Sequence, residues 1–439
     1  MQSAGRTVIF LALACASLSA PHAQSPRPNV LFILGDDLGY ETIGANGGTS
    51  YATPNLDRLA ATGVRFTQAY SQPLCTPTRL QLMTGQYNFR NWKAFGIMDP
   101  KEITFGHILS DAGYRTAIAG KWQFYSYNPP DFWPEWRGKG MRPEQSGFQE
   151  YHLWHTEHTE DKGSRYADPT IQQNGRYLTD TKGKYGPDLE TDFLIDFIER
   201  NRNQPFFAYH AMTLTHDPFN PTPHSDVWDS GNRLQTNRRF YKDMVEYMDF
   251  LIGRLVAKLD ELGLRERTLI LFYGDNGSPV GIQSRMGDRV VEGGKGLTTD
   301  NAIHVPLIAN WKGTAPEGKV LDDLIDSTDF LPTIAELTRA KMPAGMPIDG
   351  RSFLPQVQGR KGEPREWVFF HDDSTPGWNQ QDRVVQRFAR DHRFKLYQNG
   401  RFYDTVADPG EQRMIPWQGM QGEAAEAHKR LRGALDRLK

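Results

Sequence analysis

The chain has 439 residues, which is enough for one large α/β domain with an appendage or for two domains. Its 51 Lys and Arg residues nearly balance 53 Asp and Glu residues, and the formal net charge is −2 at pH 7. This balance argues against a nucleic-acid partner held by bulk electrostatics. The frequent glycines and prolines, 41 and 28 residues, suit a loop-rich enzyme better than a helical bundle.

The N-terminus has the pattern of an export signal. An apolar run at 8–18 follows a basic residue and precedes small residues up to Ala23, so we expect residues 1–23 to be a signal peptide. The run is too short for a membrane span. We therefore expect a periplasmic or secreted protein without a transmembrane anchor, with lipoprotein anchoring at Cys15 as an alternative. In either case the catalytic body has one cysteine, Cys75, and cannot form an internal disulfide.

Predicted strands and helices alternate along the chain. The continuous apolar run at 29–34 is typical of a strand buried on both faces. Thr53-Pro54 begins a helix that Gly63 ends. The remaining predicted elements are strands at 115–119, 206–209, 268–273 and 305–309, and helices at 104–113, 240–262 and 328–337. The alternation predicts an α/β fold with a large, mostly parallel or mixed sheet sandwiched by helices.

The pattern changes after Pro343. Aromatic and basic residues alternate through 388–402, which favours a small antiparallel sheet. We therefore expect a catalytic domain at 26–342 and a C-terminal α+β subdomain at 343–439.

Polar residues follow the predicted strands where the strands end. Asp36 and Asp37 follow the first strand, Asp275 and Asn276 follow the strand at 268–273, and Lys121 follows the strand at 115–119. Ligand sites in such sheets lie at the carboxyl ends of the strands. Ordinary turns would also explain Asp, Asn and Gly here. Brought together, however, the carboxylates would repel one another without a hard divalent cation, and both Ca²⁺ and Mg²⁺ prefer such oxygen ligands. Zinc is disfavoured because His and Cys do not cluster with ligand spacing.

Cys75 lies beside a predicted helix start. Thr76 suits the N-cap and Pro77 suits the first helical position. Cys75 would then lie at the positive end of the helix dipole, which lowers the pKa of a thiol. A small, buried, inert residue is the simpler interpretation for an isolated cysteine.

The motif C-x-P-x-R occurs at 75–79 as CTPTR, and LMTG follows it at 82–85. On these residues the chain resembles the type I, formylglycine-dependent sulfatases of the alkaline-phosphatase-like superfamily. Further matching segments are DDLG at 36–39, GKW at 120–122, HDPF at 216–219, DNG at 275–277, GKG at 294–296 and the C-terminal stretch 394–410. The resemblance implies an alkaline-phosphatase-like fold and a sulfuric ester hydrolase.

The resemblance also implies the cofactors. In the family this cysteine is oxidised by a formylglycine-generating enzyme to Cα-formylglycine, an aldehyde that hydrates to a geminal diol. One hydroxyl attacks sulfur and the other then expels sulfate, with a metal as Lewis acid. The implied metal is one Ca²⁺ ion. Its expected ligands are Asp36, Asp37, Asp275, Asn276 and the modified Cys75.

Further roles carry over by position. Arg79 is expected to hold the diol and the metal-side carboxylates, while Lys121 and Lys295 clamp the sulfate oxygens. His216 is expected to contact sulfate and to protonate the leaving oxygen. Many relatives have a histidine where this chain has Gln123, whose neutral amide cannot exchange a proton near neutral pH. We therefore expect His216 to carry more of the acid–base work.

Substrate contacts are predicted at Gln123, in the segments 131–185 and 300–304, and in the C-terminal subdomain. The segment 131–185 is rich in Trp, His, Arg and Tyr, which suit sugar rings and their acidic substituents. The segment 300–304 departs from the pattern of relatives, where Glu-Gly-Gly-x-Arg is frequent. The predicted substrate-binding residues are Gln123, His155, Arg165 and His304. Further candidates are Trp133, Trp136, Trp154, His158, His371, Trp378 and Arg383. We expect a sulfated carbohydrate as substrate.

Two other functions stay open. A phosphonate-monoester or phosphodiester hydrolase of the same superfamily can share the modified cysteine and the metal, and relative rates on sulfate and phosphate esters would separate it. A non-catalytic binding protein of the cell envelope would tolerate loss of Cys75, Lys121 or Lys295, but the chain contains all three.

Overall fold

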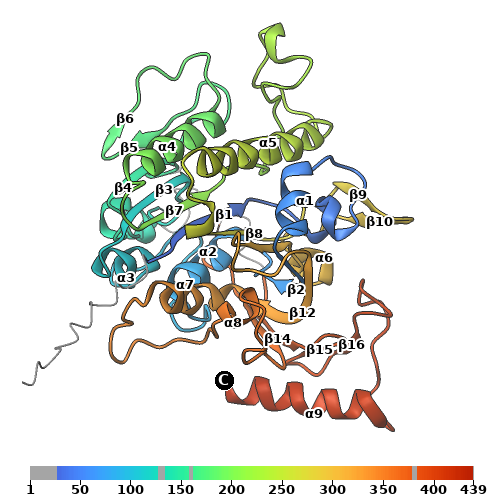
Figure 1. Ribbon diagram of the computed structural model, residues 1–439. Helices are drawn as coiled ribbons and strands as arrows, with labels where there is room; N and C mark the ends of the chain where they lie inside the picture. Colours follow the sequence, from blue (N-terminus) through green and yellow to red (C-terminus); the bar gives the residue numbers. More distant parts are fainter. Residues whose placement is uncertain (1–26, 127–133, 158–161, 378–382, 439) are drawn as a thin grey trace, which may run out of the picture.

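The computed structural model describes residues 27–126, 134–157, 162–377 and 383–438 (Figure 1). The predicted signal peptide with Cys15 lies outside this part of the chain, as do Trp133, His158 and Trp378. None of the helices within the described residues has the length and apolar character needed to cross a bilayer.

A ten-stranded sheet forms the centre of the fold, with the order β12-β2-β11-β8-β1-β7-β3-β4-β5-β6. Its strands are β1 (Asn29–Gly35), β2 (Val64–Tyr70), β3 (Arg115–Lys121), β4 (Glu150–Trp154), β5 (Gln172–Gln173), β6 (Arg176–Tyr177), β7 (Phe206–Ala211), β8 (Thr268–Gly274), β11 (Leu307–Asn310) and β12 (Lys319–Asp326). The strands from β8 to β4 are parallel. β11 runs antiparallel to both of its neighbours. The predicted mixed α/β sheet is therefore confirmed.

Helices cover both faces of this sheet (Figure 1). The helices are α1 (Pro54–Ala61), α2 (Cys75–Thr84), α3 (Phe105–Asp111), α4 (Gly186–Arg200), α5 (Phe240–Glu261), α6 (Asp300–Ile303), α7 (Phe330–Thr338), α8 (Leu354–Val357) and α9 (Gly422–Arg437). In β1, Phe32 and Leu34 pack into a core with α2, α3 and α7. Leu31 and Ile33 pack into the opposite core, with α1, α4 and α5. Burial on both faces explains the continuous apolar run of β1.

Several predicted boundaries shift. The predicted strand at 305–309 is β11, which starts at Leu307 because Pro306 has no N–H to donate to the ladder. The predicted helix at 328–337 divides into a 3₁₀ turn at Ser327–Asp329 and α7. Lys121 is the last residue of β3 rather than part of a following turn.

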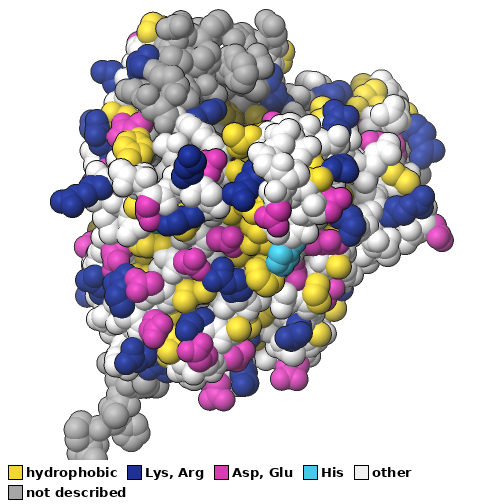
Figure 2. All heavy atoms as spheres, turned by 90° about the horizontal axis from the view of Figure 1, so that it is seen from above, with side chains coloured by type: hydrophobic (Ala, Val, Ile, Leu, Met, Phe, Trp, Pro, Cys, Tyr) yellow, Lys and Arg dark blue, Asp and Glu magenta, His cyan; other side chains and the backbone are white. Residues whose placement is uncertain are grey.

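The C-terminal region contains the predicted antiparallel sheet. Its strands are β13 (Val368–Asp372), β14 (Gln386–Arg390), β15 (Phe394–Tyr397) and β16 (Phe402–Asp404), paired in chain order. Helix α9 packs on this sheet, below the large sheet in Figure 1. A separate two-stranded hairpin consists of β9 (Gln283–Met286) and β10 (Arg289–Glu292). Figure 2 shows basic and acidic side chains interspersed on one face of the molecule.

Candidate active site

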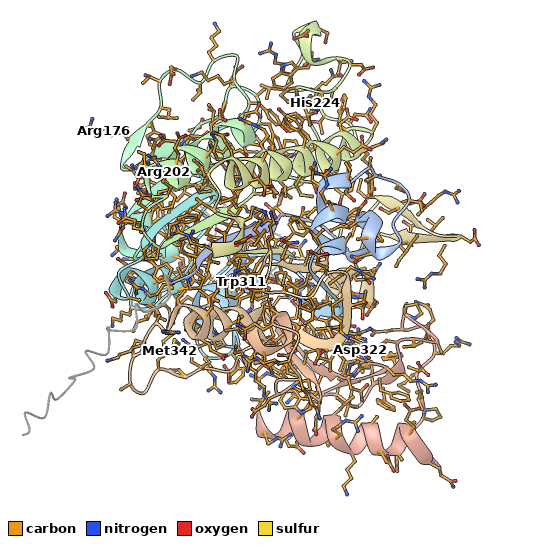
Figure 3. All side chains as sticks on the ribbon, viewed as in Figure 1. Arg176, Arg202, His224, Trp311, Asp322 and Met342 are labelled. Carbon is orange, nitrogen blue, oxygen red and sulfur yellow. The ribbon has the colours of Figure 1, made fainter. Side chains whose placement is uncertain are left out.

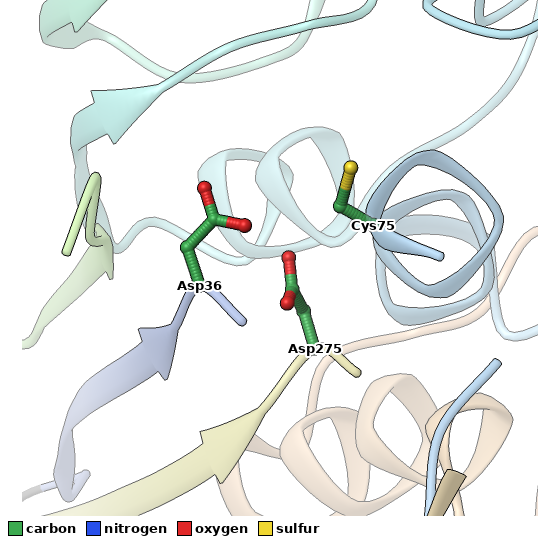
Figure 4. A group of neighbouring side chains, drawn as sticks. All are labelled: Asp36, Cys75 and Asp275. Atoms are coloured by element: carbon green, nitrogen blue, oxygen red, sulfur yellow. The ribbon is translucent and has the colours of Figure 1, made fainter. Parts of the chain in front are cut away.

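The carboxyl ends of β1 and β8 bring the predicted acidic residues together. Gly35 and Gly274 are register partners in these parallel strands, so the residues that follow them leave the sheet side by side. The Asp275 N–H donates to the Gly35 carbonyl at 3.0 Å, and the Asp37 N–H donates to Asp275 Oδ1 at 3.0 Å. Asp36, Asp37 and Asp275 are fully buried. Ligand atoms of Asp36, Asp275 and Cys75 all lie within 4.8 Å of one another, and their side chains converge (Figure 4).

Cys75 is the first residue of α2, and Leu74 is its N-cap. The prediction that Thr76 caps this helix is wrong, since its hydroxyl has no hydrogen-bond partner among the described residues. The helix can start earlier because Pro77 then lies in the first turn, where a missing N–H leaves no intrahelical bond unmade. Cys75 is 2% exposed and stays at the helix N-terminus, facing the acidic cluster.

Two cations neutralise part of this cluster. Arg79 Nε donates to Asp275 Oδ2 at 3.0 Å, and its Nη2 lies 2.9 Å from the same oxygen and 3.6 Å from Asp36 Oδ1. The Lys121 ammonium donates to Asp36 Oδ2 at 2.8 Å. Both cationic side chains are buried, so their charges are weakly screened.

Beside Asp37, the side chains of Lys295 and His216 form a second set of polar contacts. The Lys295 ammonium lies 2.7 Å from Asp37 Oδ2 and 3.0 Å from His216 Nε2. Burial would lower the pKa of Lys295, but Asp37 raises it above its usual range, so the lysine stays protonated. An ammonium group cannot accept, so Nε2 is the acceptor and His216 Nδ1 carries the hydrogen. Nδ1 donates it to the Asp217 backbone carbonyl at 2.7 Å, and Asp217 Oδ1 also lies 2.7 Å from Nδ1. Burial lowers the pKa of His216, which keeps the imidazole neutral.

The remaining electrostatics fit a bound cation. Burial opposes ionisation of Asp36, yet the surrounding cations, Lys121 first, hold its pKa well below the usual range. Burial and the nearby Asp36 charge raise the pKa of Asp275 to about 7. Asp36 Oδ1 and Asn276 Oδ1 are buried without hydrogen-bond partners among the described residues. The Asn276 amide N–H groups already bond Asp37 Oδ1 and the Gly277 carbonyl, both at 2.9 Å, which leaves the oxygen for a ligand. Such a set of carboxylate and amide oxygens suits a hard divalent cation.

A cavity of about 570 Å³ opens over Cys75. It brings together most of the predicted contact residues, namely Cys75, Lys121, Gln123, His155, Arg165, His216 and Lys295. Gln123 and His155 follow adjacent strands and adopt left-handed backbone angles, with φ of 59° and 63°. Gln123 Oε1 and both ring nitrogens of His155 are buried without hydrogen-bond partners among the described residues. These groups are therefore available to a bound molecule.

His304 does not lie in this cavity. It follows α6, bonds the Thr67 carbonyl at 2.9 Å through Nε2, and stacks on Tyr40 with ring centroids 4.1 Å apart. It lines a second cavity, of about 650 Å³, that extends towards the β9–β10 hairpin and the C-terminal sheet.

Three further residues predicted to contact the substrate have contacts within the protein. Trp136 packs against Ala94 and Ile97. His371 Nδ1 accepts from Arg387 Nε at 2.9 Å. Arg383 donates to the Gly296 carbonyl, next to Lys295.

Several residues of the site were not predicted from the sequence. Asp217 partners His216; the sequence signals for it are its position directly after that histidine and its place in the matching HDPF segment. Lys162 lines the cavity. The Lys295 loop is held by the C-terminal sheet: Thr298 Oγ1 lies 2.8 Å from Tyr397 OH, and the buried Lys395 ammonium contacts the Thr298 carbonyl.

Two family models match the chain. The model described as "Sulfatase" matches residues 28–340, and the one described as "N-sulphoglucosamine sulphohydrolase, C-terminal" matches residues 294–438. The first covers most of the chain, including every residue placed around Cys75.

Individual proteins that are similar to this chain in sequence or structure include the following three. Human arylsulfatase A is 30% identical over 419 residues, covering 90% of this chain and 80% of that protein. N-acetylgalactosamine-6-sulfatase of Sus scrofa is 32% identical over 407 residues, covering 85% and 74%. The solved structure of BT4656 in complex with its substrate, D-glucosamine-2-N,6-O-disulfate, superposes with a TM-score of 0.74 at 22% identity, covering 94% of this chain and 97% of that one.

Proposed function

The chain belongs to the sulfatase family, and from this premise we propose that it is an exported enzyme that removes sulfate from a sulfated carbohydrate. The observation that carries the proposal is the position of Cys75. It lies at the start of α2, beside Asp36 and Asp275 and on the wall of the cavity that Lys121 and Lys295 also line. A buried nucleophile position with cations around it suits an anionic ester.

We assign two cofactors to this site. Asp36, Asp37, Asp275 and Asn276 would hold one Ca²⁺ ion, and Cys75 would be converted to Cα-formylglycine by a maturation enzyme. When present, the hydrated formylglycine supplies a nucleophilic hydroxyl and the calcium ion supplies a Lewis acid. The buried, unpartnered oxygens of Asp36 and Asn276 support the metal assignment.

The protein's own side chains would bind and orient the ester. The ammonium groups of Lys121 and Lys295 place positive charge at the cavity, where charge develops on the sulfate oxygens. Arg79 fixes the Asp275 carboxylate through two contacts to one oxygen. His216 would exchange a proton at Nε2, because Asp217 holds the hydrogen on Nδ1.

The carbohydrate assignment draws on the cavity and on relatives. Several cationic and hydrogen-bonding groups line the cavity, which suits a polar, charged substrate better than a simple aryl ester. Export is expected from residues 1–23, which lie outside the described residues. We also propose that residues 26–342 form the catalytic domain and 343–439 a subdomain that supports it through the Lys295 loop.

A substrate panel tests this function. Sulfated glycan oligosaccharides, an aryl sulfate and a phosphate diester are each incubated with the enzyme, and released sulfate or phosphate and the product mass are measured. We expect sulfate release from at least one glycan and poor turnover of the aryl sulfate. Fast diester or aryl-sulfate turnover without activity on any glycan would contradict the carbohydrate assignment.

A further inference from the structure

The cavity over Cys75 contains more positive charge than one sulfate group requires. Four Lys and Arg side chains line it, Lys121, Lys162, Arg165 and Lys295, whereas Asp217 is its one lining carboxylate among the described residues. Lys121 and Lys295 are paired with Asp36 and Asp37. Within the same described residues, no carboxylate forms an ion pair with Lys162 or Arg165.

Arg165 is held in place rather than left in solvent. Its guanidinium carbon lies 3.9 Å from the ring centroid of Trp154. The residue is only 8% exposed, and its Nη1 is buried without a hydrogen-bond partner among the described residues. A cation held this way by an aromatic face is pre-organised, and a buried guanidinium nitrogen without an acceptor is costly. An anionic ligand group would supply that acceptor.

Trp154 was predicted to contact a sugar ring, but the structure gives its indole a different role. Trp154 is 2% exposed, so its face is covered by Arg165 and cannot stack on a sugar. Its Nε1 donates to the Gly163 carbonyl at 3.1 Å, which fixes the ring. The indole serves as the platform that orients the guanidinium.

The neighbouring groups strengthen the positive potential. Burial and the charges of Arg165 and Lys121 lower the pKa of Lys162 to about 8, and the opposing charge of Asp217 is the smaller effect. The Asp217 carboxylate already lies against His216, with Oδ1 2.7 Å from Nδ1. Both ring nitrogens of the buried His155 are free of partners among the described residues, and the one that carries the hydrogen can donate to the same ligand group.

Arg165 and Lys121 face the same cavity. Trp154 and Lys121 are register partners in the adjacent parallel strands β4 and β3, and Arg165, which stacks on Trp154, lines the cavity together with Lys121. Two anionic substituents of one saccharide can therefore occupy this cavity together.

We propose that Arg165, supported by Lys162 and oriented by Trp154, binds a second anionic group of the substrate, a carboxylate or a second sulfate that is not cleaved. This inference rests on the proposed function and names its substrate more closely: a sugar with two anionic groups.

Binding to the Cys75→Ala protein tests the inference without turnover. The probes are two matched pairs. One pair is N-acetylglucosamine 6-sulfate, whose amide is neutral, and glucosamine 2-N,6-O-disulfate. The other is a glucuronic acid–galactosamine 6-sulfate disaccharide and the same disaccharide with its carboxylate reduced to an alcohol. We expect the doubly anionic member of at least one pair to bind about tenfold more tightly by calorimetry, and the pair that shows the preference distinguishes sulfate from carboxylate.

Variants of Arg165 test whether this residue causes the preference for the doubly anionic probe. Arg165→Gln should reduce the tenfold advantage to about threefold or less, and Arg165→Lys should restore only part of it because the planar fork is lost. The matched control is Arg176→Gln, which removes a cation from the exposed outer strand β6 (Figure 3) and should preserve the advantage. Equal dissociation constants within both pairs, no measurable binding of any probe, or a preference unchanged by Arg165→Gln would overturn the inference.

Failure of the proposed sulfatase activity can be distinguished from failure of the second-anion site. Sulfate release by the unsubstituted enzyme from these saccharides, without a charge preference, would overturn only the second-anion site. A charge preference that depends on Arg165, without sulfate release, would support that site and overturn the proposed activity.

Discussion

Replacing Asp217 by asparagine removes the negative charge beside His216, while the Asp217 backbone carbonyl, 2.7 Å from Nδ1, and a side-chain oxygen remain as acceptors of the Nδ1 hydrogen. The Nδ1–Oδ1 distance is 2.7 Å, and the Asp217 side chain is 63% exposed. A hydrogen bond to a charged group contributes about 1.5–3 kcal/mol and a neutral one about 0.5–1.5 kcal/mol. Because solvent screens this exposed carboxylate, we take the low end of the difference, about 1 kcal/mol. Asp217→Asn should therefore lower kcat/KM about fivefold.

The pH profile identifies the cause. The Asp217 charge favours the protonated imidazole, so its loss should lower the pKa of His216 still further below the ordinary value. The limb of the kcat/KM profile that His216 governs should consequently move to lower pH. The assay is the initial rate of sulfate release across the acidic and neutral range. Asp226→Asn, at an exposed position on the same connection, is the matched control and should change neither quantity. An unchanged profile in Asp217→Asn would refute the proposed role of His216.

Chelation should abolish activity and lower the melting temperature, because the buried carboxylates lose their compensating charge, and Ca²⁺ should restore both; full activity in metal-free enzyme would contradict the assigned ligands. Lys395 has a pKa lowered by burial to about 8 from an ordinary 10.5. Between pH 8 and pH 10.5 the unfolded state therefore binds a proton that the folded state lacks. The contribution of Lys395 to the free energy of unfolding should consequently rise with pH, by up to about 3 kcal/mol over this range. Lys395→Met should lose that slope in urea titrations, and an identical slope would refute the burial argument. His304→Ala should keep kcat/KM within about twofold, since His304 lies in the other cavity, while losing about 1 kcal/mol of stability with its stacking; a tenfold loss of kcat/KM would show that the two cavities act as one site.

Sequence patterns predicted the central strands because burial on both faces leaves a continuous apolar run, as in β1. They missed β12, whose sequence KVLDDLID places two aspartates between apolar residues and is buried only at its end. They also missed β2, which alternates buried and partly exposed residues in VRFTQAY. Such edge regions are fixed by pairing with strands distant in sequence, which local patterns do not record.

The acidic residues and Lys121 could be placed together because they lie at or directly after strand ends that a parallel sheet gathers at one edge. Cys75 was joined to them only through the family resemblance, because the strand before it, β2, was not predicted. The position of His304 could not be predicted, since its stacking on Tyr40 depends on the packing of α6 against β2. The stacking of Arg165 on Trp154 likewise joins two residues of an irregular connection. Side-chain contacts across loops are set by tertiary packing rather than by spacing in the sequence.

The central claim is that turnover depends on a modified Cys75. Mass spectrometry of the peptide that contains Cys75, isolated from protein with measured sulfatase activity, tests it most directly. We predict the mass of formylglycine or its hydrate, in a fraction that rises with specific activity and with co-expression of a formylglycine-generating enzyme. A fully active protein in which Cys75 carries an unmodified thiol would contradict the account.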